Sequence, residues 1–168
     1  MSELDQLPDD FAEILDCLCN AGVEFLVVGG HAVAFHGHPR ATGDFDLFVR
    51  PSDTNAARVI AALTSFGAPL SDHSVSAADF IKPGTVYQLG LPPRRIDFMT
   101  SISGVAFDAA WASRVPTAFR QHTIHFLSRK DLIQNKKASG RTKDLADVER
   151  LAPKKTKARA RKRRPRHR

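Results

Sequence analysis

A short hydrophobic segment that ends in two glycines, followed by an acidic segment of alternating polarity, constrains the fold of this chain more than any other feature. The segment 25–28 is β-branched and aromatic and stops at Gly29-Gly30, which predicts a buried strand that enters a tight turn. After thirteen intervening residues, 44–49 reads Asp-Phe-Asp-Leu-Phe-Val. Because successive side chains of a strand point to opposite faces, this alternation places Asp44 and Asp46 on the same face. We therefore expect a sheet with two carboxylates on one side, close to a glycine turn.

Helical and strand patterns alternate along the rest of the chain. Apolar residues recur every three or four positions over 8–21, and again from the capping residues Ser52 and Asp53 to Gly67, which predicts two amphipathic helices. A chain of 168 residues with 42% hydrophobic content suits one domain. The fold class is therefore expected to be α/β (α+β), a small mixed β-sheet with helices packed on it, over residues 1–152. Further helices are predicted at 31–36, 107–115, 129–139 (capped by Ser128) and 142–151, and further strands at 86–91, 95–100 and 123–127, with Pro92-Pro93 as the turn of a hairpin.

Basic residues are concentrated at the C-terminus. Ten of the 25 Lys and Arg residues lie between Lys154 and Arg168, which leaves 15 basic against 18 acidic side chains in the rest of the chain. Residues 153–168 are therefore predicted to be a basic disordered tail. Its charge predicts non-specific binding to nucleic-acid phosphates, and its lack of aromatic residues argues against base-specific recognition. A solubility extension or a docking arm for a protein partner is an equal alternative.

Composition also predicts the compartment. Cys17 and Cys19 are the only cysteines, and at that spacing on a helix they do not form a disulfide with each other, which fits a reducing, cytoplasmic setting. Residues 1–10 are acidic and do not resemble a signal peptide. The longest apolar runs are far too short to span a bilayer, so no membrane partner is expected.

The glycines and the acidic residues together suggest phosphate chemistry. Gly29 and Gly30 allow the backbone to approach a phosphate closely, and amide groups at the start of the next helix can bind its oxygens. Asp97, in the predicted hairpin, would bring a third carboxylate to Asp44 and Asp46. Three clustered carboxylates repel one another unless a cation lies between them, and an all-oxygen site suits Mg²⁺. One or two Mg²⁺ ions could align a nucleoside triphosphate and a hydroxyl for in-line attack at the α-phosphorus, which is nucleotidyl transfer.

The segment from Val28-Gly29-Gly30 to Asp44-Phe45-Asp46-Leu47, with Ile96-Asp97-Phe98, resembles the signature of the DNA polymerase β-like nucleotidyltransferase superfamily. Within it, the chain is similar to the minimal nucleotidyltransferases and the AbiEii-like toxins. The resemblance covers roughly 25–151. It implies that Gly29 and Gly30 lie at the phosphates, that Asp44, Asp46 and Asp97 bind metal, and that Asp97 also acts as the base. It further implies a toxin–antitoxin setting.

Four other residues are candidates for nucleotide binding. His31 occupies the position after the diglycine, where many relatives have a small hydroxyl residue that touches phosphate. Lys137 and Lys143 belong to a segment, 136–147, that is similar to the end of AbiEii-like domains, and by that similarity they reach the nucleotide or its acceptor. A solvated helix end is the alternative for these lysines. Arg40 is expected to contact either a phosphate or one of the aspartates.

Two functions follow from these residues. The first is an enzyme, a Mg²⁺-dependent nucleotidyltransferase that moves a nucleoside monophosphate to a hydroxyl of a protein, an RNA or a small molecule. The second is a catalytically inactive binding module with the same fold, antitoxin-like or RNA-associated. The non-functional alternative for Asp44 and Asp46 is that they lie on a solvated strand face. For Asp97 it is that the residue is an exposed polar side chain of a hairpin.

Overall fold

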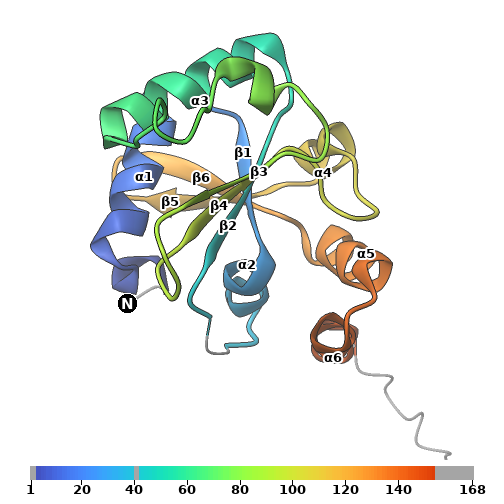
Figure 1. Cartoon of the computed structure of the whole chain (residues 1–168). Coiled ribbons are helices and arrows are strands. Elements are labelled where there is room, and N and C mark those ends of the chain that lie inside the picture. The colour runs from blue at the N-terminus through green and yellow to red at the C-terminus, as the bar shows by residue number, and fades with distance from the viewer. Residues whose placement is uncertain (1–2, 40–41, 154–168) are drawn as a thin grey trace, which may run out of the picture.

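The computed structural model describes residues 3–39 and 42–153. Within these ranges the chain has the α/β fold expected from its sequence, a six-stranded mixed sheet with helices packed on it (Figure 1). The strands are β1 (Phe25–Val28), β2 (Phe45–Val49), β3 (Val86–Leu89), β4 (Ile96–Met99), β5 (Val115–Phe119) and β6 (His122–Phe126). The helices are α1 (Asp9–Asn20), α2 (Gly29–Phe35), α3 (Asp53–Phe66), α4 (Phe107–Ala112), α5 (Arg129–Ser139) and α6 (Thr142–Leu151), with short 3₁₀ helices at η1 (Glu3–Gln6) and η2 (Ala77–Phe80).

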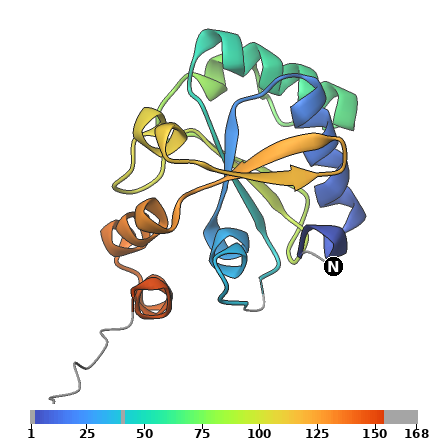
Figure 2. The ribbon, with the colours of Figure 1, turned by 180° about the vertical axis from the view of Figure 1, so that it is seen from behind.

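The order of strands in the sheet is β3-β4-β2-β1-β6-β5. β2 pairs with β4 and β1 with β6 in parallel, and the other neighbours are antiparallel. The β5–β6 hairpin forms one edge of the sheet and is seen in orange in the view from behind (Figure 2). In the centre of the sheet, Val28 at the end of β1 is opposite Asp46, and Asp46 is opposite Asp97. The register therefore brings the glycine turn after β1 next to two carboxylates.

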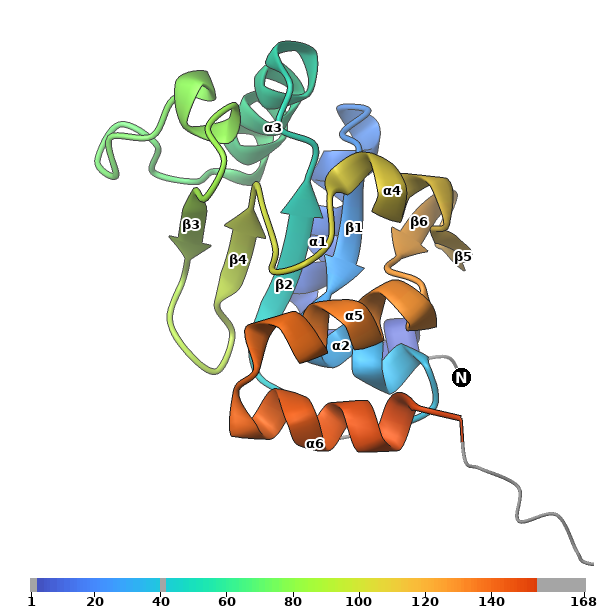
Figure 3. The same ribbon diagram turned by 90° about the vertical axis from the view of Figure 1, so that its right-hand side faces the viewer.

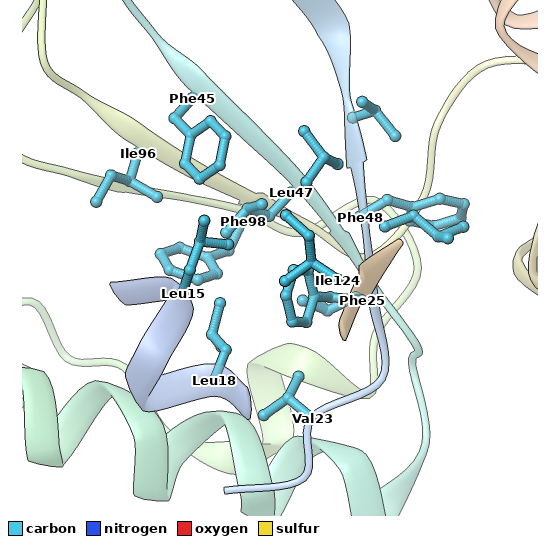
Figure 4. Close-up of a cluster of buried hydrophobic side chains, with 14 of the residues drawn as sticks. Leu15, Leu18, Val23, Phe25, Phe45, Leu47, Phe48, Ile96, Phe98 and Ile124 are labelled. Atoms are coloured by element: carbon cyan, nitrogen blue, oxygen red, sulfur yellow. The ribbon is translucent and has the colours of Figure 1, made fainter. Parts of the chain in front are cut away.

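The two faces of the sheet are covered differently. Phe45 and Leu47 of β2 lie among the apolar side chains of α1 and β4 (Figure 4). The ring of Phe45 stacks on Phe11 of α1, with 4.9 Å between the ring centroids. Phe48 faces the other side and meets Phe107 of α4 edge-on, at 5.0 Å. Figure 3 shows α4 and α5 on the near side of the sheet and α1 on its far side. Because β2 alternates, Asp46 faces the same side as α4 and α5.

Two of the predicted helix caps are present. The Ser52 side chain accepts a hydrogen bond from the Asn55 amide at the start of α3, and the Ser128 side chain accepts one from the Asp131 amide at the start of α5. These bonds satisfy amides that have no partner within the helix. Gly67 and Gly140 end the same two helices in the left-handed conformation. The caps fix where α5 begins and ends, and α5 forms one wall of the site described below.

The helix predicted over 107–115 is wrong in its last part. Helix α4 ends at Ala112, and β5 follows it as an edge strand that pairs with β6. An edge strand accommodates Pro116, whose missing N–H would interrupt a central strand. The pairing with β6 determines this conformation, and a local pattern does not reveal it.

No helix within the described ranges has the length and apolar character needed to cross a membrane.

Candidate active site

Asp46 and Asp97 are neighbours across two parallel strands. They are register partners in β2 and β4, so their side chains leave the sheet on the same face. Phe45 and Leu47, on either side of Asp46, are buried in the core on the opposite face and hold the strand in this orientation. Asp44 lies just before β2, two positions from Asp46. The sheet thus brings all three predicted carboxylates to one cleft.

The absence of a side chain at Gly29 leaves room for the carboxylate of Asp46. The residue has a φ of +67°, and a Cβ atom placed on it would lie 2.1 Å from the Asp46 Oδ2 atom. A side chain at this position would overlap the carboxylate and would also strain the backbone. The diglycine turn and the acidic strand are therefore mutually dependent, which explains why they occur together.

A second glycine holds the segment before Asp44. A Cβ atom on Gly43 would lie 2.7 Å from the carbonyl oxygen of Pro93, in the turn between β3 and β4. The Phe45 amide also donates a hydrogen bond of 2.8 Å to the Arg95 carbonyl. The start of β2 is thus fitted closely against the start of β4.

The cleft has a volume of about 590 Å³. Asp44, Asp46 and Asp97 form its acidic part beside Gly29 and Gly30, and α5, α6 and the loop after β4 form the opposite wall. Figure 3 shows α5 in front of the lower part of the sheet with α6 below it. The end of β4 contributes Met99, and the lining residues from that wall are Ser101, Ile102, Ser103, Asn135, Lys136, Ser139, Arg141, Lys143 and Asp144.

The pKa of Asp46 is raised by its surroundings. Burial raises its pKa to about 6, and the charges of Asp97 and Asp44 contribute to the shift, whereas Lys136 and Lys143 oppose it. Asp46 has no hydrogen bond or ion pair with any residue that the structure describes. A half-buried carboxylate beside two others is electrostatically unfavourable, and a cation would relieve this repulsion.

Arg95, which was not predicted as a site residue, spans two of the carboxylates. Its Nε atom lies 2.7 Å from Asp97 Oδ1, and its Nη2 atom lies 3.1 Å from Asp97 Oδ2 and 3.1 Å from Asp44 Oδ2. The hydrogen bond to Asp97 raises the pKa of the guanidinium, partly opposed by burial. Arg95 and Asp97 are two positions apart in an extended segment, so their shared face was the available signal in the sequence.

Helices α5 and α6 carry a buried charged cluster formed by Lys136, Asp144 and Asp147. The Lys136 Nζ atom lies 3.0 Å from Asp144 Oδ1 and 3.1 Å from Asp147 Oδ2. Burial would raise the pKa of Asp144, but hydrogen bonds from Ser139, Arg141 and Lys136 outweigh it and hold the pKa well below its ordinary range. The cluster fixes α6 against α5 and places a lysine in the cleft wall.

The other predicted nucleotide-binding residues are placed as follows. Gly29, Gly30 and Lys143 line the cleft. Lys137 is exposed and is not among the lining residues, and the preceding Lys136 takes that place. Arg40 and the tail from Lys154 to Arg168 lie outside the described residues.

The structure does not bring the side chain of His31 to the cleft. Its ring meets Phe11 and Phe45 edge-on, with centroid distances of 5.9 and 5.0 Å. It lines a separate apolar cavity of about 70 Å³ together with residues of η1 and β6. Burial lowers the pKa of His31, which favours the neutral ring. As the third residue of α2, His31 lies on the helix face turned away from the carboxylates.

The carboxylates have the right chemistry for a divalent cation but are not arranged as a finished metal site. Over residues 3–39 and 42–153, no three His, Cys, Asp or Glu side chains are grouped as metal ligands. Arg95 lies across Asp44 and Asp97 instead. Two features nevertheless fit Mg²⁺: the donors are all carboxylate oxygens, and Asp44 Oδ1 is buried without a hydrogen-bond partner among the residues that the structure describes. The residues present thus fit a hard cation once the guanidinium is displaced.

Comparison with known proteins identifies a family and a shared fold. Residues 8–167 match the model of a protein family described as "Nucleotidyl transferase of unknown function (DUF2204)". Among solved structures, the chain is similar to the lincosamide antibiotic adenylyltransferase LnuA in its lincomycin-bound form, with a TM-score of 0.53 and 15% sequence identity. That match covers 86% of this chain and 96% of the other, and it shows a shared nucleotidyltransferase fold. No curated protein matches the sequence.

Proposed function

Because the chain belongs to this family of nucleotidyltransferases, we propose that it transfers a nucleoside monophosphate from a nucleoside triphosphate to a hydroxyl group, with Mg²⁺. One observation carries the proposal: Asp46 and Asp97 are register partners on adjacent parallel strands, and Asp44 and the diglycine turn border the same cleft. The cleft volume of about 590 Å³ is in the range of small-molecule sites. Acidic strand ends beside a glycine turn suit the cation and the phosphates of such a substrate.

The three carboxylates would hold the metal. Asp44, Asp46 and Asp97 supply oxygen ligands, and a bound Mg²⁺ would neutralise the charge of the phosphates and of the attacking and leaving oxygens. Asp46 suits this role because it is half-buried beside two like charges and has no protein hydrogen bond within the described ranges.

Other residues of the cleft would position the triphosphate. Gly29 and Gly30 line the cleft, where a backbone without side chains can come close to phosphate oxygens. Lys136 and Lys143 line the opposite wall, and both act electrostatically on Asp46. Lys136 is held in place by two buried carboxylates, so it would meet a phosphate with little loss of side-chain entropy.

The reaction itself is an in-line displacement. The acceptor hydroxyl oxygen forms a bond to the α-phosphorus, the bond from that phosphorus to the bridging oxygen breaks, and pyrophosphate leaves with the bonding electrons. The hydroxyl proton passes to a carboxylate, for which the family resemblance favours Asp97. Its position in β4 beside Asp46 places it in the cleft where the hydroxyl would approach.

The acceptor and the biological setting are narrower proposals. The resemblance of 136–147 to AbiEii-like domains supports a toxin–antitoxin setting. The basic residues from Lys154 to Arg168 support a nucleic-acid partner, with a protein partner as the alternative, on composition alone.

The test is transfer of label from α-³²P nucleoside triphosphates to tRNA, to proteins of a cell extract and to small hydroxyl compounds, with Mg²⁺ or with EDTA. We expect Mg²⁺-dependent labelling that D46N and D97N reduce at least about 100-fold. The matched control is D72N, since Asp72 is exposed and outside the cleft. Labelling that survives in D46N and D97N would contradict the proposal, and nucleotide binding without any transfer would favour the inactive binding module.

A further inference from the structure

Arg95 occupies the oxygens that a metal ion would use. Of the six carboxylate oxygens on Asp44, Asp46 and Asp97, three lie within 3.1 Å of its guanidinium nitrogens. The planar guanidinium group of an arginine fits this arrangement. Two of its nitrogens can donate hydrogen bonds to one carboxylate while one of these nitrogens also lies close to a second carboxylate. The contact is thus specific to the shape of the side chain as well as to its charge.

Arg95 and a divalent cation cannot use these oxygens together without a large penalty. Mg²⁺ binds carboxylate oxygens at about 2.0–2.1 Å and demands near-octahedral geometry. Two positive groups that share the same oxygens would repel each other at short range. Binding of the cation therefore requires the guanidinium to leave at least one carboxylate.

We propose that Arg95 is a built-in counter-cation that holds Asp44 and Asp97 in the nucleotide-free protein and competes with the divalent cation for them. This inference rests on the proposed function. It gives Arg95 two effects: it offsets the repulsion among the carboxylates before the substrate arrives, and it lowers the affinity for the free ion. The full charge of the guanidinium persists at every physiological pH, so changes in pH do not remove the competition.

The neighbouring Arg94 provides a matched control. It lies beside Arg95 in the same turn, is exposed, and is outside the lining of the cleft. R94Q and R95Q remove the same charge from adjacent positions, so general electrostatic attraction of Mg²⁺ by a less positive protein affects both. Only R95Q frees the carboxylate oxygens.

The experiment is a calorimetric titration of the full-length chain with Mg²⁺, in the absence of nucleotide, for wild type, R94Q, R95Q and R95K. We expect R95Q to bind Mg²⁺ about fivefold more tightly than R94Q, the change that corresponds to an ion pair of about 1 kcal/mol. R95K keeps the positive charge but lacks the planar guanidinium group, so its affinity for Mg²⁺ should lie between those of wild type and R95Q. Thermal unfolding in EDTA and in Mg²⁺ verifies that each variant is folded, and Mg²⁺ should raise the midpoint of R95Q more than that of R94Q.

Two failures are distinguishable. If wild type and R94Q bind Mg²⁺ and R95Q binds no more tightly, or more weakly, Arg95 only positions Asp97 and this inference is wrong while the proposed function stands. If none of the four chains binds Mg²⁺ even when a nucleoside triphosphate is added, the metal-dependent function fails, and the competition with it.

Discussion

The Oδ2 atom of Asp46 lies where a side chain on Gly29 would begin, 2.1 Å from the position of its Cβ atom. The turn after β1 and the carboxylate on β2 therefore share one small volume. This relationship links the fold to the proposed chemistry, because the same glycine that follows a buried strand also leaves Asp46 room beside the diglycine turn. It can be tested by substitution.

Gly29→Ala should disrupt the cleft, and Gly37→Ala should not. Both glycines have a positive φ, +67° and +92°, so alanine strains the backbone at each by about 1–2 kcal/mol. Among the described residues, no atom of a non-neighbouring residue lies within 4 Å of a Cβ on Gly37, whereas a Cβ on Gly29 overlaps Asp46. We expect G37A to retain binding of Mg²⁺ and nucleoside triphosphate, and G29A to lose at least about tenfold in affinity by calorimetry. Equal affinities for the two variants would contradict the steric role of Gly29.

The stability of the metal-free protein should depend on pH through Asp46. Its pKa is about 6 in the folded chain and near its ordinary value of 3.8 when unfolded. Between these values the folded state binds more protons than the unfolded state, so the free energy of unfolding falls as pH rises from about 4 to 6. The shift of about two units corresponds to a loss of at most about 3 kcal/mol.

D46N removes this contribution and supplies the comparison. Urea unfolding in EDTA at several values between pH 4 and pH 7 should show D46N becoming more stable relative to wild type as pH rises, with a constant difference above about pH 6.5. If the difference in unfolding free energy between D46N and wild type does not change with pH, the pKa of Asp46 is not raised in the folded protein.

Lys136 should be essential for stability, and its neighbour Lys137 should not. K136M leaves two carboxylates, Asp144 and Asp147, buried without their shared ammonium group, which typically costs about 3–5 kcal/mol. Lys137 is exposed, and K137M should change the free energy of unfolding by less than about 0.5 kcal/mol. Urea denaturation of both variants at pH 7 measures the difference. Comparable losses in the two would mean that the cluster does not stabilise α6 on α5.

Removal of residues 154–168 should leave the chemistry intact and weaken contact with nucleic acid. These residues lie outside the described part of the chain, and ten of the fifteen are Lys or Arg. The truncated chain should retain Mg²⁺-dependent transfer to small acceptors. In filter binding to tRNA at increasing salt, its affinity should be lower and should depend less steeply on salt than that of the full chain. An unchanged salt dependence would assign nucleic-acid binding, if present, to the folded domain.

The local patterns of the sequence predicted the elements that build the acidic side of the cleft. The run 25–28 before Gly29-Gly30 and the alternation of 44–49 have short-range causes, namely glycine geometry and the period of a strand. Asp97 could be placed on a strand, but its position beside Asp46 depends on parallel pairing of β2 with β4, which joins segments about fifty residues apart. The family resemblance supplied that link.

The positions of Lys136, Arg95 and His31 relative to the cleft depend on tertiary packing. Lys136 and Lys137 are adjacent residues of the same type. Only the orientation of α5 about its axis determines which of the two faces the buried carboxylates of α6. The sequence alone does not distinguish Arg95 as a site residue, because an arginine near an aspartate on a hairpin is usually a surface pair. His31 follows the diglycine directly, yet the turn of α2 points its ring toward Phe11 and Phe45.

The most direct test of the proposed site is a crystal structure with Mn²⁺ and a non-hydrolysable nucleoside triphosphate, with data collected for the anomalous signal of manganese. The proposed function predicts a peak in the cleft within about 2.0–2.3 Å of oxygens from Asp44, Asp46 and Asp97. It further predicts that the Arg95 guanidinium has moved off at least one of the two carboxylates it now spans. A structure with the nucleotide bound elsewhere, no anomalous peak among the three carboxylates and Arg95 still across Asp44 and Asp97 would contradict it.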